Sequence, residues 1–243
     1  LALSVVSIIG LMMAGFGSAN KYAGIGALRS AAQLISYEIP IIVVALTIAM
    51  IAGSLNLTTI ANAQGSVPFI LVQPLGITIF FLAGVAEAGR TPFDIFHAES
   101  EVMGGPFVEY SGAHWSIFYL TEYMNTFLIA ALVTLLFLGG WHGPWLPAVI
   151  WFLIKIYAVI LIMFWFRGTF PRLRVDHLMA LGWKAFVPLS FLNFVITAFS
   201  LYYGWPSWSL GLAGLAILFG LTIASYVKTV SRKNTPTVIL VPA

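Results

Sequence analysis

Long uncharged apolar runs dominate this sequence and restrict its fold more than any other feature. A helix that crosses about 30 Å of hydrocarbon needs roughly 20 mostly apolar residues, because each residue advances it by about 1.5 Å. Seven stretches meet this requirement, at residues 1–18, 37–53, 67–86, 115–139, 146–166, 183–203 and 208–227. They also lack the alternating pattern of a membrane barrel strand. The sequence therefore predicts one all-α integral membrane domain at residues 1–243, a polytopic bundle of about seven transmembrane helices with structured cytoplasmic loops.

The composition limits the chemistry that this chain can perform alone. Hydrophobic residues make up 60% of it and charged residues only 8%, against about 25% charged in a soluble domain. The net charge of +3 rests on few groups and does not indicate a nucleic-acid partner. The sequence contains no cysteine, which excludes thiolate metal ligands, iron–sulfur ligation and a cysteine nucleophile. The four histidines are scattered without the spacing of metal ligands. Any redox metal is therefore expected in a partner.

The basic residues predict the orientation in the membrane. Ten of the 11 lysines and arginines follow the first, third, fifth and seventh runs, whereas the other connections carry no charge. By the positive-inside rule, the odd-numbered connections face the cytoplasm or its organellar equivalent. The chain also begins at Leu1 inside an apolar run that has no signal-peptide features. We therefore expect the N-terminal part of the protein to be missing from the sequence.

The acidic residues are concentrated in one loop on the predicted cytoplasmic side. Five of the eight acids fall within 23 residues: Glu87, Asp94, Glu99, Glu101 and Glu109. One interpretation is a solvated acidic loop. Against it, apolar residues are interspersed, and anionic headgroups attract basic rather than acidic loops. The alternative is a structured loop, folded on the membrane domain or covered by a partner, whose close carboxylates pass protons near neutral pH.

Single ionisable residues within the apolar runs are further candidates. Glu38 opens the second run just before Pro40, Glu122 lies early in the fourth, and Lys155 lies midway along the fifth. A buried charge in a membrane is costly unless it is paired or hydrated, so such residues are functional candidates. Exposure at the interface, or snorkelling of Lys155, is the alternative. The basic group after the fifth run has two interpretations, as an orientation signal or as neutralisation of the acidic loop: Arg167, Arg172, Arg174 and Lys184, with Asp176 among them.

Four segments resemble one family of membrane subunits. The stretch AEAGRTPFDIFHAESEVMGGPFVEYSG is similar to the acidic cytoplasmic loop of one membrane subunit of respiratory NADH:quinone oxidoreductase (complex I), called subunit 1 in mitochondria and the H subunit in bacteria. KYAGIGALRSAAQLISYEIP, GGWHGP and FRGTFPRLRVDHLMALGWKAFVPLSFLN resemble further segments of that family in the same order. The GGWHGP turn favours a bacterial source, and hence the cytoplasmic membrane over the mitochondrial inner membrane.

The resemblance implies a role in quinone reduction and proton translocation. The subunit would line part of the quinone chamber at the junction with the peripheral arm, would bind no cofactor, and would take quinone as substrate, with FMN and iron–sulfur clusters in partner subunits. The proton-coupling residues that match the family are Glu38, Glu87, Asp94, Glu99, Glu101, Glu109, Glu122 and Lys155. The matching residues for the electrostatics of the chamber and loops are Arg29, Arg90, Arg167, Arg172, Arg174 and Asp176.

His97 and Phe96 depart from the family pattern, which commonly has a glutamate and a proline or alanine at these positions. Because an imidazole with a pKa of about 6.5 can still relay protons, the exchange changes the electrostatics without ending the path. We hypothesise that the loop acids respond to quinone reduction and that Glu38, with Lys155 as a charge partner, carries the signal laterally.

Two alternatives remain open at this point. One is the anchor subunit of a membrane-bound hydrogenase, which shares the bundle, although the long ESEVMGGPFVEYSG loop favours the quinone-reducing relative. The other is a secondary transporter, which would show inverted repeats and matching broken helices in its two halves. The halves match poorly here, since Pro188 is the only candidate counterpart of Pro40.

Overall fold

The chain is helical throughout the residues that the computed structural model describes, which are 4–65, 67–95 and 105–234. No strand occurs among them, and the predicted all-α fold is confirmed. The elements in order are α1 (Ser4–Gly17), α2 (Lys21–Ala52), α3 (Leu57–Ala63), α4 (Phe69–Val72), α5 (Pro74–Glu87), the 3₁₀ turn η1 (Gly105–Phe107), α7 (Gly112–Phe137), α8 (Ala148–Thr169), α9 (Val175–Leu181), the π-helical turn η2 (Gly182–Phe186), α10 (Val187–Tyr202) and α11 (Ser207–Asn234).

Each of the seven predicted apolar runs contains a helix. In the described part of the chain, four helical segments are long and apolar enough to cross a membrane: Lys21–Ala52, Gly112–Phe137, Ala148–Thr169 and Val175–Tyr202. Three shorter apolar helices lie at Ser4–Gly17, Pro74–Glu87 and Trp208–Ile223. The chain is thus a helical membrane protein, while the number of crossings stays a prediction.

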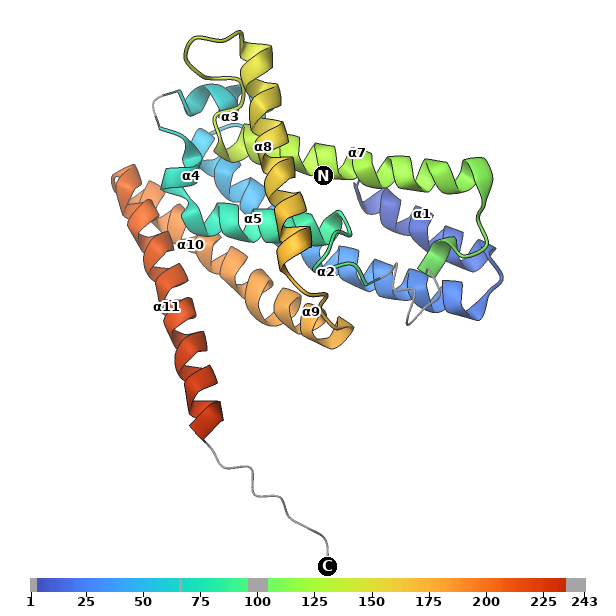
Figure 1. Cartoon of the computed structure of the whole chain (residues 1–243). Helices are drawn as coiled ribbons and strands as arrows, with labels where there is room; N and C mark the ends of the chain where they lie inside the picture. The colour runs from blue at the N-terminus through green and yellow to red at the C-terminus, as the bar shows by residue number, and fades with distance from the viewer. Residues whose placement is uncertain (1–3, 66, 96–104, 235–243) are drawn as a thin grey trace, which may run out of the picture.

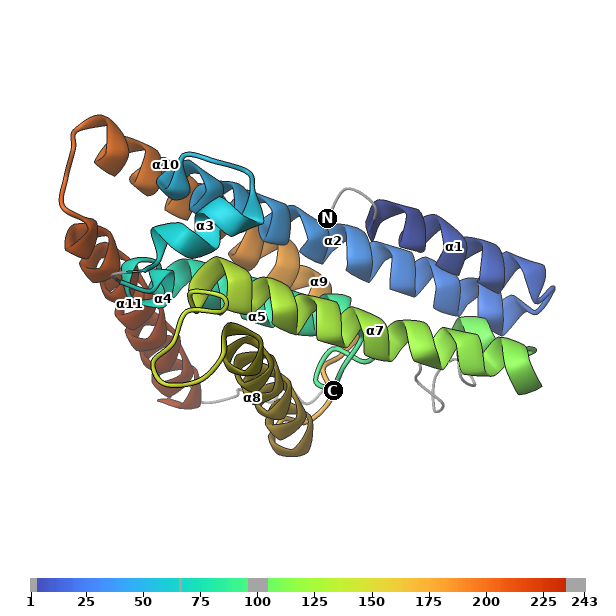
Figure 2. The same ribbon diagram turned by 90° about the horizontal axis from the view of Figure 1, so that it is seen from above.

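Four of the helices lie alongside one another, and two others cross them. α1, α2, α5 and α7 run roughly alongside one another, whereas α8 and α11 cross this group steeply (Figures 1 and 2). The later turns of α11 extend away from the other helices (Figure 1). The core lies between α2, α5 and α7, where Tyr37, Ile79, Phe80 and Phe137 are almost fully buried. This core holds together the three helices that carry Glu38, Glu87 and Glu122.

The helix that carries Glu38 is longer than the sequence predicts. α2 begins at Lys21 instead of near residue 37 and spans 32 residues. Asn20 caps its first turn, its side chain accepting a hydrogen bond from the amide of Tyr22 at 3.1 Å. The early turns are rich in alanine, the best helix former, and remain helical although they are less apolar than the rest. Glu38 therefore lies within a continuous helix and not at its start.

Prolines interrupt two other predicted runs. Gln73, which precedes Pro74, has φ −131° and ψ 61°, and this residue separates α4 from α5. Proline disfavours the helical conformation of the residue before it and has no amide hydrogen. The π-helical turn η2 likewise lies just before Pro188, so the helical segment from Val175 to Tyr202 is irregular in its middle. Hydropathy alone does not reveal these breaks, because the residues around them are apolar.

Candidate functional site

The acidic loop begins where α5 ends. Gly89 has a φ of 65°, a left-handed conformation that favours glycine, and the chain leaves the helix there. Glu87 is the last residue of α5, and Arg90 follows the turn with an exposed fraction of only 7%. The break therefore brings an acid and a buried arginine to the same end of α5.

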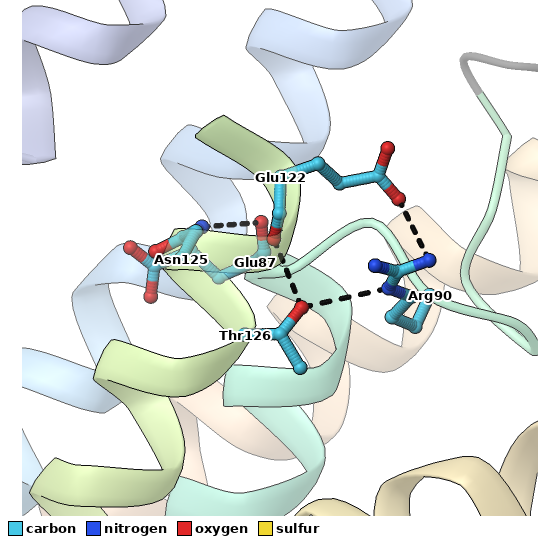
Figure 3. A network of polar contacts seen from close by, with 5 residues as sticks. All are labelled: Glu87, Arg90, Glu122, Asn125 and Thr126. Atoms are coloured by element: carbon cyan, nitrogen blue, oxygen red, sulfur yellow. Dashed lines mark hydrogen bonds and ion pairs between the residues drawn. The ribbon is translucent and has the colours of Figure 1, made fainter. Parts of the chain in front are cut away.

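Arg90 reaches across to α7, where it pairs with Glu122 (Figure 3). Its Nη1 lies 3.1 Å from Oε1 of Glu122, and its Nε donates to the Thr126 hydroxyl at 3.5 Å. The guanidinium also lies 4.5 Å from the centre of the Tyr123 ring, a cation–π contact. Because both charged side chains are largely buried, at 8% and 15% exposed, each depends on the other for its stabilisation.

Glu87 lines a cavity, and Glu38 is connected to it through Ser4. The cavity has a volume of about 340 Å³, and its polar lining comes from Ser4, Glu87 and Asn125, while apolar side chains from α2, α5 and α7 complete it. Ser4 donates a hydrogen bond of 2.6 Å to Oε1 of Glu38, and Asn125 donates to the backbone carbonyl of Glu87 at 3.3 Å. The Glu38 carboxylate is thus linked by one hydrogen bond to a residue of the cavity that Glu87 lines. Two acids predicted separately from the sequence therefore lie around one cavity.

The other loop acids are less closely grouped. Asp94 is half-buried, two residues after the cis peptide bond between Thr91 and Pro92. Glu109 is exposed and accepts a hydrogen bond of 3.0 Å from Asn20 Nδ2, near the turn between α1 and α2. Glu99 and Glu101, together with His97 and Phe96, lie outside the described residues. Their place in a common acidic site stays a prediction.

Gln33 is a site residue that the sequence does not reveal. It is 1% exposed, and its Nε2 donates to the carbonyls of Ala86 and Phe93 at 2.7 and 2.8 Å. One side-chain amide on α2 thus holds both ends of the segment that carries Glu87 and Arg90. A polar residue amid the alanines of α2 is the signal that could have identified it.

The loop between α8 and α9, which carries the basic group, contacts backbone carbonyls at the start of the acidic loop. Arg172 Nη2 donates to the Ile95 carbonyl at 3.3 Å, and the amide of Leu173 donates to the Pro92 carbonyl at 3.0 Å. Arg167, Arg174 and Asp176 are exposed, and Arg29 is half-buried. The two loops are therefore joined, and neutralisation of the loop acids by Arg172 and Arg174 stays a prediction.

The hydrogen bonds of Lys155 go to backbone carbonyls and not to acidic side chains. Its Nζ donates to the carbonyls of Leu138, Gly140 and His142 at 2.7, 3.0 and 2.7 Å, in the turn after α7. Three carbonyls satisfy the three donors of the ammonium group. Among the described residues, no ion pair joins Lys155 to Glu38. The expected charge partnership is thus absent from the described contacts, which show Lys155 closing the C-terminal end of α7.

This arrangement contains groups that can hold a proton and groups that can compensate its charge. Carboxyl groups beside a cavity, a buried arginine–glutamate pair and fixed backbone carbonyls provide sites where a charge can be gained, lost or compensated. No group of three histidine or acidic side chains gathers as a metal site in the part of the chain that is described.

Comparison with known proteins shows the family. The sequence model of the family described as NADH dehydrogenase matches residues 1–198. The H subunit of the NADH-quinone oxidoreductase of Geobacillus thermodenitrificans is 50% identical over 202 residues, which cover 82% of this chain and 61% of that protein. The H subunit of Dehalococcoides mccartyi is 48% identical over 225 residues, covering 92% of this chain and 64% of the relative.

A third relative agrees with these two. The H subunit of Carboxydothermus hydrogenoformans is 47% identical over 205 residues, covering 83% of this chain and 59% of the relative. The chain spans about three fifths of the length of the relatives it matches. Since the family model covers most of the sequence, the chain belongs to the NADH dehydrogenase family, as do these bacterial subunits.

Proposed function

We propose that this chain is the membrane subunit of a bacterial proton-pumping NADH:quinone oxidoreductase, located in the cytoplasmic membrane. Its relatives are named as H subunits of NADH-quinone oxidoreductase, and its apolar helices suit a bilayer. In this proposal the chain forms part of the quinone chamber at the junction with the peripheral arm. Neighbouring subunits hold FMN and the iron–sulfur clusters, and further membrane-arm subunits lie beside it.

The cavity that Glu87 lines, with Glu38 bound to its lining residue Ser4, is the observation that carries the coupling role. A volume of about 340 Å³ holds several water molecules, since each occupies about 30 Å³ in the liquid. Water in this space would link the carboxyl group of Glu87 with the Ser4 hydroxyl that binds Glu38. The two acids could therefore exchange protons through the interior of the helical group.

The charges around the loop suggest how quinone reduction would reach these acids. A proton gained by Glu38 or Glu87 removes a negative charge from this region, and its loss restores that charge. Arg90 lies three residues beyond Glu87 and is paired with Glu122. A shift of the loop would therefore change the surroundings of Glu87 and of the Arg90–Glu122 pair together. In the proposal Asp94, Glu99, Glu101 and Glu109 line the approach from the peripheral arm. Lys155, Arg29 and the basic loop contribute to its electrostatics.

Glutamine variants test this function in the assembled enzyme. Glu38→Gln and Glu87→Gln keep the size of the side chain but remove its proton exchange. We expect both to lower quinone reductase activity and the proton-to-electron ratio, while electron transfer to an artificial acceptor that bypasses quinone is retained. His114→Gln, an exposed change on α7, is the matched control. Wild-type turnover and stoichiometry in both variants would refute the coupling role.

A further inference from the structure

α10 has the polarity of its faces reversed relative to a helix of a soluble protein. All its buried residues are polar, namely Ser190, Asn193, Thr197 and Ser200, each at most 4% exposed. Their spacing of three and four residues places them on one face. The opposite face exposes apolar side chains such as Phe191, Val195 and Phe199. A buried polar face three turns long must find hydrogen-bond partners inside the protein, because lipid supplies none.

Protein groups supply hydrogen-bond partners for only part of this polar face. Ser190 donates to the Val187 carbonyl at 2.8 Å, and Thr197 donates to the Asn193 carbonyl at 2.8 Å. Gln73 Nε2 reaches across from the start of α5 and donates to the Thr197 hydroxyl, also at 2.8 Å. Among the described residues, Asn193 Nδ2 and Ser200 Oγ are buried without a partner. Such orphaned groups in a native interior commonly mark bound water or an ion.

The break between α4 and α5 leaves a backbone carbonyl without its usual helical donor. Gln73 separates α4 from α5, and Pro74 has no amide hydrogen to give to the carbonyl of Ile70. Non-helical backbone at membrane depth is tolerated where it is buried in protein or lines a hydrated space.

Gly76 leaves space between the two elements. A Cβ atom built on Gly76 would lie 3.4 Å from Asn193 Nδ2 and 3.5 Å from Gln73 Oε1. The amide nitrogen of one residue and the amide oxygen of the other therefore border the same small space, one able to donate and the other able to accept.

We propose that this interface is a buried water site, in which one water molecule bridges Asn193 and Gln73 over Gly76 and another binds the Ser200 hydroxyl. Water satisfies donors and acceptors alike, whereas a cation satisfies only oxygen atoms. No acidic side chain is among the residues that form the site, so a cation would also lack charge compensation. The site lies at the opposite end of α5 from Glu87 and does not depend on the proposed function.

The first test is a cryo-EM map of the protein purified from its native membrane with the subunits it retains, at a resolution that shows ordered water. We expect density within hydrogen-bonding distance of both Asn193 and Gln73. Resolved side chains without this density would overturn the proposal. So would a peak that is replaced when sodium is exchanged for rubidium, because it would identify a cation.

The second test is Gly76→Ala, in which the added methyl group would occupy the place of the water. Alanine favours a helix over glycine, so a dry site predicts a higher melting temperature for this variant. We expect instead that the density is lost and that the melting temperature does not rise. Gly24→Ala in α2 is the matched control, since a Cβ there meets nothing within 4 Å. An equal rise in melting temperature in both variants would contradict the bound water.

Discussion

Removing Arg90 should destabilise the protein, because Glu122 would lose its partner in a largely buried ion pair. Arg90→Met removes the guanidinium but keeps much of its apolar volume, and it leaves the Glu122 carboxylate without its ion-pair partner at 3.1 Å. Breaking a buried pair in this way costs about 3–5 kcal/mol. Glu122 remains 15% exposed and can be partly hydrated, so we place the loss at about 3 kcal/mol, the lower end of that range.

The loss should be visible as a lower melting temperature. For a chain of this size, about 1 kcal/mol corresponds to roughly 2–4 °C, so Arg90→Met should melt roughly 6–12 °C lower. Membranes containing each variant are heated, aggregated protein is removed, and the remaining chain is quantified by immunoblot. Arg174→Met, at an exposed arginine, should change the melting temperature little. The Glu122→Leu change in the Arg90→Met background should recover part of the loss, because no unpaired charge then remains.

Equal melting temperatures for Arg90→Met and Arg174→Met would refute the reasoning. They would show that water or lipid compensates Glu122 as well as the guanidinium does. A double variant that loses the sum of the two single changes would also contradict it, because the two residues would then act independently.

Lys155→Met removes three hydrogen bonds to the turn after α7; we expect a loss of about 2–4 kcal/mol in a melting assay. Gln33→Leu frees both ends of the Glu87 segment, so protease cleavage in that segment should accelerate while α8 stays protected. Gly26→Ala places a Cβ 2.7 Å from the Gly105 backbone, and cross-linking between α2 and η1 should fall; unchanged cross-linking would contradict this packing.

The sequence predicts the helical membrane fold well because apolar runs have few alternatives in a bilayer. It predicts the ends of the helices less well. Residues 21–36 are less apolar than a membrane span, yet the Asn20 cap and several alanines extend α2 through them. Conversely, the run at 67–86 is apolar enough to look continuous, although Pro74 divides it. Local backbone chemistry, which a hydropathy window averages out, decides both cases.

The sequence predicts the candidate site as a set of residues but not as a geometry. Glu38 and Glu87 stand out because acids are scarce in apolar runs, but their position around one cavity depends on how α2 packs against α5. The contacts of Lys155 are decided by the fold of the turn after α7, which charge patterning does not describe. Gln33 and Asn193 are uncharged and do not stand out, although burial gives each of them a specific partner or an unmet need for one.

Native gel electrophoresis of the solubilised membrane tests the central claim most directly. The membrane is extracted in mild detergent, the chain is located by immunoblot, and NADH oxidation is stained in the same gel. If the chain is the quinone-side membrane subunit, it migrates in a very large assembly that oxidises NADH. Migration of the chain alone, or in an assembly that does not oxidise NADH, would contradict the account.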